Sequence, residues 1–126
     1  MHKKMLIGLV LFGLLTALLS ACGIKDLGAA SGPSVHMNGT DFVQTSVTIH
    51  KGDMLNLIDD AASTHIIVNG SWINSTAKPA VEPGAPTVNQ QYNGNDSAPI
   101  GPFNTAGAFH LYCTIHQNMN LTVIVQ

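Results

Sequence analysis

The sequence predicts an all-β domain, in which two sheets form a sandwich with Greek-key connections. Two observations favour this fold class. After residue 34, no segment of the 126-residue chain places its apolar residues at helical spacing. Short runs rich in β-branched, aromatic and other apolar residues occur instead, separated by turn signals, at residues 47–49, 65–69, 109–113 and 121–125. Six or seven short strands in a domain of about 92 residues are typical of a two-sheet sandwich.

Turn signals separate the expected strands. Residues 51–53 and the Asn-Gly pairs at 38–39, 69–70 and 93–94 predict tight turns, because both residue types tolerate positive φ angles. The pair at 69–70 is expected to end the strand that contains His65. Residues 71–104 hold most of the prolines and show no clear period. We expect that stretch to be either a functional flap or a set of strands that the pattern does not reveal.

The first 22 residues have the pattern of an export signal. Lys3 and Lys4 precede an apolar run over residues 5–19, which is too short to cross a bilayer of about 30 Å as a helix. The run ends in Leu19-Ser20-Ala21-Cys22, which resembles the lipobox of bacterial lipoproteins. That resemblance implies cleavage before Cys22 and lipidation of Cys22. A plain signal peptide with an incidental cysteine is the alternative.

This pattern divides the chain into three expected parts. Residues 1–21 are the expected lipoprotein signal peptide, residues 22–34 the lipidated N-terminus with a flexible tether, and residues 35–126 the folded domain. We expect an extracytoplasmic location, periplasmic or on the outer cell surface. The lipid on Cys22 would hold the protein at a bacterial membrane without spanning it.

The composition excludes two classes of protein. All five basic residues are lysines, they form no cluster, and arginine is absent, so nucleic acid is not an expected partner. Residues 22–126 carry three lysines against seven acidic residues, a formal charge of −4, which gives only weak electrostatic steering. With Cys22 lipidated, Cys113 is the one remaining cysteine, so a disulfide scaffold is excluded as well.

The most informative motif is Cys113-x2-His116-x2-Met119, which lies between two expected strands. Alternate residues of a strand face the same way, so the Cys113 thiol shares the apolar face of residues 109–113, and the Met119 thioether shares that of residues 119–125. The short loop between them would bring His116 over the same spot. His65 opens an apolar run elsewhere in the chain and is expected to supply a second imidazole.

A thiolate, two imidazoles and a weak thioether are the ligand set of a type 1 copper site. Zinc is the chemical competitor, because one cysteine and two histidines can hold it, although structural zinc rarely uses methionine. A dinuclear copper site with two bridging thiolates is excluded, since only Cys113 is available. The simplest alternative is that His116 is an ordinary loop histidine and Met119 an ordinary core methionine.

The domain resembles the cupredoxins, the type 1 blue copper proteins of the plastocyanin and amicyanin kind. The resemblance rests on THIIV at residues 64–68, GAFHLYCTIHQNM at 107–119, FVQTSVTIHKGD at 42–53 and the closing TVIV. It implies a Greek-key β-sandwich and one copper ion bound by His65, Cys113, His116 and Met119. It also implies that electrons pass through His116 at the solvent edge.

Two features of the ligand loop follow from the same comparison. The loop spacing is most similar to that of amicyanin, but Ile115 and Gln117 stand where amicyanin-like loops carry prolines. Tyr112, expected to face outward, matches the surface tyrosine of plastocyanins. The expected docking surface comprises Tyr112, Ile115, His116, Gln117 and Asn118.

We therefore expect a membrane-anchored, monomeric one-electron carrier that docks transiently with protein redox partners and is not an enzyme. An extracytoplasmic copper-handling protein (a scavenger, chaperone or sensor) would use the same residues. The chain has five methionines, two of them in the expected signal region, which argues against a Met-rich scavenger. The pattern offers no second metal cluster for an oxidase or reductase.

The remaining polar candidates have ordinary explanations. We expect three histidines on the surface: His36, His50 and His110. The last two occupy expected strand positions whose side chains alternate outward, away from the core. Asp59 and Asp60 are expected to form a solvated turn.

Overall fold

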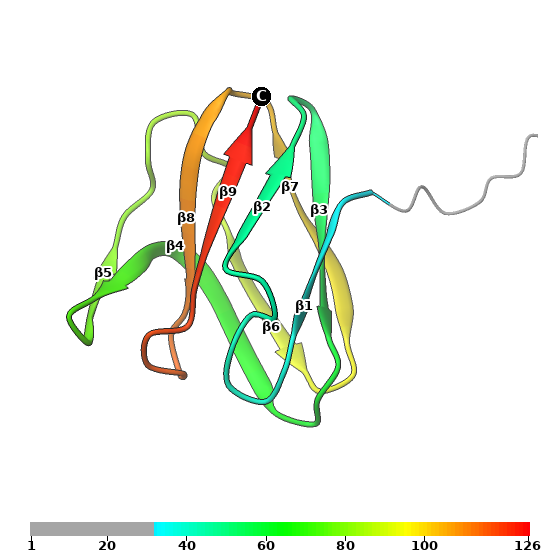
Figure 1. Ribbon diagram of the computed structural model, residues 1–126, viewed down its shortest axis with the longest axis vertical. Coiled ribbons are helices and arrows are strands. Elements are labelled where there is room, and N and C mark those ends of the chain that lie inside the picture. The colour runs from blue at the N-terminus through cyan, green and yellow to red at the C-terminus, as the bar shows by residue number, and fades with distance from the viewer. Residues whose placement is uncertain (1–31) are drawn as a thin grey trace, which may run out of the picture. The chain divides into compact units, whose positions relative to one another are not determined.

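The computed structural model describes residues 32–126, which form two β-sheets packed around a common core (Figure 1). The strands are β1 (Ser34–Met37), β2 (Ser46–Ile49), β3 (Asp53–Asp59), β4 (Thr64–Ile73), β5 (Thr76–Pro79), β6 (Asn89–Asn93), β7 (Ser97–Phe103), β8 (Gly107–Cys113) and β9 (Asn120–Val125). The all-β prediction is confirmed. Within this part of the chain, no helix has the length and apolar character needed to cross a membrane.

One sheet has three strands and the other has six. In the smaller sheet, β3 pairs in parallel with β1 and antiparallel with β7. The larger sheet runs β2-β9-β8-β4-β5, and β6 also pairs with β4. Its β2 and β9 are parallel, whereas β8 is antiparallel to both β9 and β4. The last two long strands, β8 and β9, therefore lie side by side, and the loop between them is at one end of the sandwich.

The core follows the predicted alternation in β8 and β9. Phe109, Leu111 and Cys113 are buried on one face of β8, and alternate residues of β9 from Leu121 to Val125 are buried beside them. The smaller sheet contributes alternate residues of β1 and β3 to the same cluster. The inward direction of the Cys113 side chain is therefore fixed by strand geometry.

Residues 71–104 are not one long flap, because they contain the end of β4 and all of β5, β6 and β7. Residues 32–126 therefore contain nine strands, where six or seven were expected. The connection between β5 and β6 is tied to the large sheet by Asn69, which donates to the carbonyl of Pro86 (3.0 Å) and accepts from the amide of Val88 (2.6 Å). Glu82 in the same connection accepts from the amide of His110 (2.8 Å) and also contacts its imidazole.

The predicted turn at Asn69-Gly70 is wrong. Strand β4 continues through both residues to Ile73, and the turn lies at Asn74 and Ser75, which have φ angles of 48° and 60°. Gly70 has a φ of 122°, and a Cβ atom there would lie 2.3 Å from the carbonyl oxygen of Lys78. Glycine is thus required here by a bend within a strand and by close backbone approach, as is common for glycines inside strands.

Candidate metal centre

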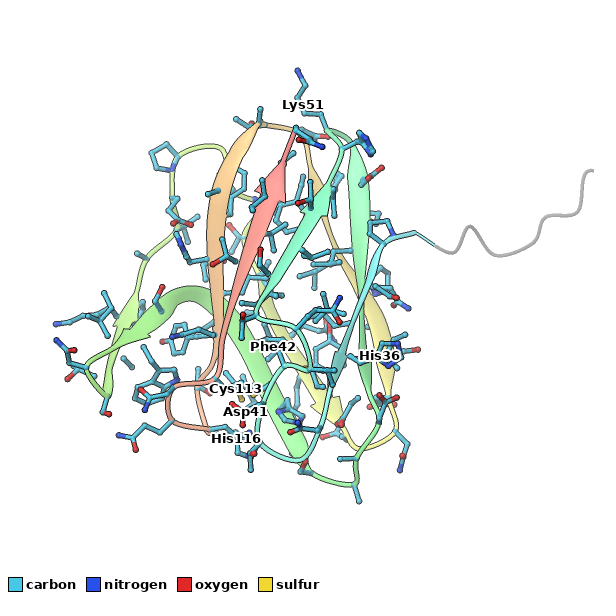
Figure 2. The ribbon with its side chains drawn as sticks, in the orientation of Figure 1. His36, Asp41, Phe42, Lys51, Cys113 and His116 are labelled. Carbon is cyan, nitrogen blue, oxygen red and sulfur yellow. The ribbon has the colours of Figure 1, made fainter. Side chains whose placement is uncertain are left out.

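Three of the predicted ligands meet at one end of the sandwich. Cys113 is the last residue of β8, His65 is the second residue of β4, and His116 lies in the loop between β8 and β9. Figure 2 shows Cys113 and His116 at the bottom of the view, at the opposite end from Lys51. The possible ligand atoms of His65, Cys113 and His116 all lie within 4.8 Å of one another.

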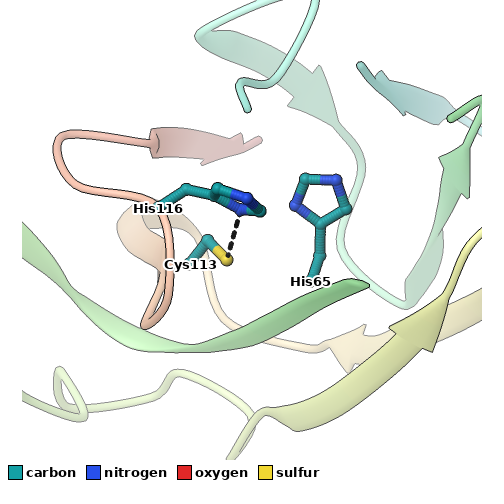
Figure 3. Close-up of side chains that lie close together, drawn as sticks. All are labelled: His65, Cys113 and His116. Carbon is teal, nitrogen blue, oxygen red and sulfur yellow. Dashed lines mark hydrogen bonds between the residues drawn. The ribbon is translucent and has the colours of Figure 1, made fainter. Parts of the chain in front are cut away.

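The three side chains converge on one point (Figure 3). The Cys113 Sγ lies 3.5 Å from the Nδ1 atom of His116, and the two imidazole rings have centroids 4.7 Å apart, tilted by 51°. Protein donors bind a transition metal at about 2.0–2.3 Å. A small inward movement of the side chains would therefore bring all three donor atoms to a common ion.

His65 presents an unpaired nitrogen to this cluster. The residue is fully buried, and its Nε2 donates to the carbonyl oxygen of Asn38 at 2.9 Å. Because a carbonyl only accepts, the proton lies on Nε2, and Nδ1 carries a free lone pair. Among the described residues, that Nδ1 has no hydrogen-bond partner. An unsatisfied buried polar atom costs about 1–3 kcal/mol, so a bound metal is the natural partner for it.

Burial lowers the pKa of His65 below its ordinary value of 6.5, while the nearby Asp59 carboxylate and the bond to Asn38 oppose that shift. The ring is therefore neutral at neutral pH and able to bind a metal. Asp59 lies 3.7 Å from Nε2 and is itself buried. The expectation of a solvated turn is wrong for Asp59, because its carboxylate accepts from the amides of Ala61 (3.0 Å) and Gly94 (3.2 Å).

Met119 is buried where the ligand loop joins β9. Its amide donates to the carbonyl of His116 (3.2 Å), and its carbonyl accepts from the amide of Cys113 (3.1 Å). These bonds close the loop, and Met119 lies on the same buried face of the chain as Leu121. The role of the thioether as a fourth donor stays a prediction.

Three of the five residues of the expected docking surface are exposed. Ile115 is half exposed, Gln117 and Asn118 are exposed, and His116 is partly buried. Tyr112 is only 3% exposed, so its assignment to a surface patch is wrong. Tyr112 does face away from the apolar side of β8, as predicted, but the ring of Trp72 packs edge-on against it with centroids 5.9 Å apart. That cover comes from a part of the chain 40 residues away, which parity within β8 does not reveal.

The other predicted surface histidines lie outside the cluster. His50 is exposed, and His36 pairs with the exposed Asp60 at 2.7 Å. His110 is half-buried against Glu82. The role of the Asn38 carbonyl in orienting His65 could not be predicted from the sequence, because a main-chain contact does not depend on the side chain at that position.

Comparisons with known proteins agree with this architecture. No protein-family model matches the chain, and no curated protein matches it. Among solved structures, amicyanin from Paracoccus versutus is 21% identical with a TM-score of 0.59, over 77% of this chain and 83% of that one. A purple cupredoxin from Nitrosopumilus maritimus is 16% identical with a TM-score of 0.59, over 75% of this chain and 99% of that one.

A larger protein contains a similar domain. The copper-containing nitrite reductase from Thermus scotoductus is 15% identical with a TM-score of 0.56, over 75% of this chain but only 22% of the reductase. Together with the strand order, these likenesses show that residues 32–126 have the cupredoxin fold. The cluster of His65, Cys113 and His116, with Met119 three residues further along the loop, has the donor set of a type 1 copper site.

Proposed function

We propose that the protein carries single electrons between redox partners outside the cytoplasm, with one type 1 copper ion held by His65, Cys113, His116 and Met119. The observation that carries the proposal is the buried Nδ1 of His65, which has no hydrogen-bond partner in residues 32–126 and lies beside the Cys113 thiol and the His116 ring. A copper ion bound there supplies one-electron chemistry, between Cu(II) and Cu(I).

The protein's contribution is a fixed set of donors. Cys113 and His65 lie on two strands of one sheet, in which β4 and β8 pair at Ile67 and Cys113. The hydrogen bond to Asn38 fixes the orientation of His65. Thiolate sulfur suits Cu(I), and imidazole suits both oxidation states. Donors held this rigidly would move little when an electron arrives or leaves, which favours fast transfer.

The ligand loop is also suited to transient docking. Residues 114–119 carry no charged side chain, and the half-exposed Ile115 precedes the partly buried His116 in this loop. Weak redox encounters use small interfaces, below about 1,200 Å². Electrons would then pass through the His116 ring, and binding to a partner would depend little on salt.

Attachment to a membrane through Cys22 is part of the proposal. Cys22 lies outside the described residues, and its support is the sequence Leu19-Ser20-Ala21-Cys22 alone. A Cys22→Ala variant should move the protein from the membrane fraction to the soluble fraction and leave copper binding unchanged. A variant that remains membrane-bound would contradict lipid anchoring at this residue.

The test of electron transfer is a reversible redox cycle of the copper-loaded protein. We expect Cu(II) to give an intense visible band from the Cys113 thiolate, which one equivalent of reductant bleaches and one equivalent of oxidant restores. Colourless Cu(I) that is bound and then passed to an acceptor would instead favour copper handling. Failure to bind copper at all would overturn both functions.

A further inference from the structure

The hairpin of β4 and β5 is bonded to the ligand loop and to the first residue of β9. The amide of Trp72 donates to the Asn120 side chain (2.7 Å), and that side chain donates to the Trp72 carbonyl (3.0 Å). The Trp72 indole donates to the carbonyl of Cys113 (2.8 Å). At the tip, Gln117 donates to the Ser75 carbonyl and Asn118 to the Ser75 hydroxyl, both at 3.3 Å.

Strand geometry explains why the bonds to Asn120 form. Strand β4 pairs with β8 only from Ile67 to Asn69, and it then bends at Gly70, away from the register of the sheet. Beyond the bend, Trp72 pairs with Ala77 of β5 on one side, and on the other side no strand of residues 32–126 pairs with it. The side-chain amide of Asn120 supplies both a donor and an acceptor to that free edge.

The Trp72 ring reaches a metal-ligand residue directly. Its indole nitrogen bonds to the main chain of Cys113, and its ring covers Tyr112, the residue before. Together with the pairing of β8 with β4, which reaches Cys113, this side chain holds the end of β8 at the position where the thiolate is presented. Groups that orient metal ligands in this way commonly change metal affinity by about 10–100-fold when they are removed.

The ligand loop has few restraints of its own. Residues 114–119 contain no proline, and Asn118 adopts a φ angle of 66°. Two main-chain bonds close the loop, from the Cys113 amide to Met119 and from the Met119 amide to His116. The hairpin adds bonds at Cys113, Gln117, Asn118 and Asn120, so it contacts the loop at both ends and near the middle.

We propose that the β4–β5 hairpin is a clamp that keeps the 113–120 segment in its metal-binding shape, with Trp72 and Asn120 as positioning residues. The effect of the clamp on metal binding rests on the proposed copper function, whereas its hydrogen bonds to the loop do not. The clamp takes over the stiffening that prolines would otherwise give the loop. Because the hairpin lies at the edge of the large sheet, an amide of the smaller sheet can report separately on general destabilisation.

Two variants and one control test the clamp. Trp72→Phe removes the indole donor and keeps a ring against Tyr112, and Asn120→Ala removes the side-chain amide. Thr76→Ala is the control, since Thr76 is exposed on β5 and forms no hydrogen bond to the loop among the described residues. If Asn120→Ala is too unstable to purify, Trp72→Phe still decides the question.

The first measurement is amide hydrogen exchange in the metal-free full-length protein. In both variants, we expect the amides of Cys113 and Met119 to exchange about tenfold faster, as the loss of one hydrogen bond implies. The amide of Leu55, in the smaller sheet, should be unchanged, and so should every amide in the control. Equal acceleration at Leu55 would show general destabilisation and overturn the clamp, as would no change at the loop.

The second measurement is the rate of copper release to a chelator from the loaded protein. We expect about tenfold faster release from both variants and no change in the control. Faster exchange in the loop without faster release would overturn the role in metal binding. A wild-type protein that takes up no copper would instead overturn the proposed function, and the exchange data alone would then decide the clamp.

Discussion

Replacing Gly70 by alanine should destabilise the protein strongly, because the position has neither the backbone freedom nor the space for a Cβ atom. Its φ angle of 122° is unfavourable for any other residue. The new Cβ would lie 2.3 Å from the carbonyl oxygen of Lys78 and 2.9 Å from the backbone of Pro79 and Ala80. These are main-chain atoms, so the hairpin itself would have to move.

The expected loss of stability has two parts, backbone strain and a steric clash, and variants of two other glycines distinguish them. Backbone strain costs about 1–3 kcal/mol, and displacing the hairpin would lose hydrogen bonds worth about 1 kcal/mol each. Together they predict a loss of about 2–4 kcal/mol. Gly52→Ala has strain without a clash, since its φ is 91° and nothing lies within 4 Å. Gly39→Ala has no positive φ angle, and its closest contact is at 3.8 Å.

Urea denaturation of the metal-free proteins measures these differences. With an m-value of about 2 kcal/mol/M, Gly70→Ala should lower the midpoint by about 1–2 M. Gly52→Ala should lose about 1–2 kcal/mol, and Gly39→Ala should stay within about 0.5 kcal/mol of the wild type. If Gly70→Ala lost no more stability than Gly52→Ala, the close packing of the hairpin against Gly70 would be refuted.

Three further outcomes follow from the site. Cys113→Ser should abolish the visible Cu(II) band, and an unchanged absorption spectrum would exclude Cys113 as a ligand. Met119→Leu should keep copper but raise the reduction potential, by about 59 mV for each tenfold loss of preference for Cu(II); an unchanged potential in voltammetry would show that Met119 is not a donor. In the metal-free protein, the lowered pKa of His65 means that the unfolded chain takes up a proton before the folded one does. Stability due to this group is therefore complete above pH 6.5 and falls at lower pH, by at most about 1.4 kcal/mol per pH unit. His65→Gln should reduce this slope in urea melts between pH 7.5 and 5.5, and equal slopes would contradict the assignment.

Local patterns predicted the strands that carry the site. Alternation in residues 109–113 and 119–125 was enough to place Cys113 and Met119 on the buried face, because side-chain direction in a strand depends on parity alone. The all-β class followed from the absence of helical spacing. These features are local, and no knowledge of distant contacts was needed.

Long-range contacts explain what the sequence did not predict. The pair Asn69-Gly70 has the composition of a turn, but Gly70 is needed for the close approach of residues 78–80. Tyr112 points away from the core as expected and is nevertheless buried, because Trp72 folds over it. Asp59 is buried because it binds the amide of Gly94, 35 residues away. In each case, the contacting residue lies within residues 71–104, whose sequence pattern does not predict their strands.

The most direct test of the central claim is the ligand environment of copper in the loaded protein, measured by X-ray absorption at the copper edge. The convergence of His65, Cys113 and His116 predicts one short bond to sulfur and two bonds to imidazole nitrogen. The sulfur contribution at that short distance should disappear in Cys113→Ser. A copper ion surrounded only by nitrogen and oxygen, with the same spectrum in both proteins, would contradict the account.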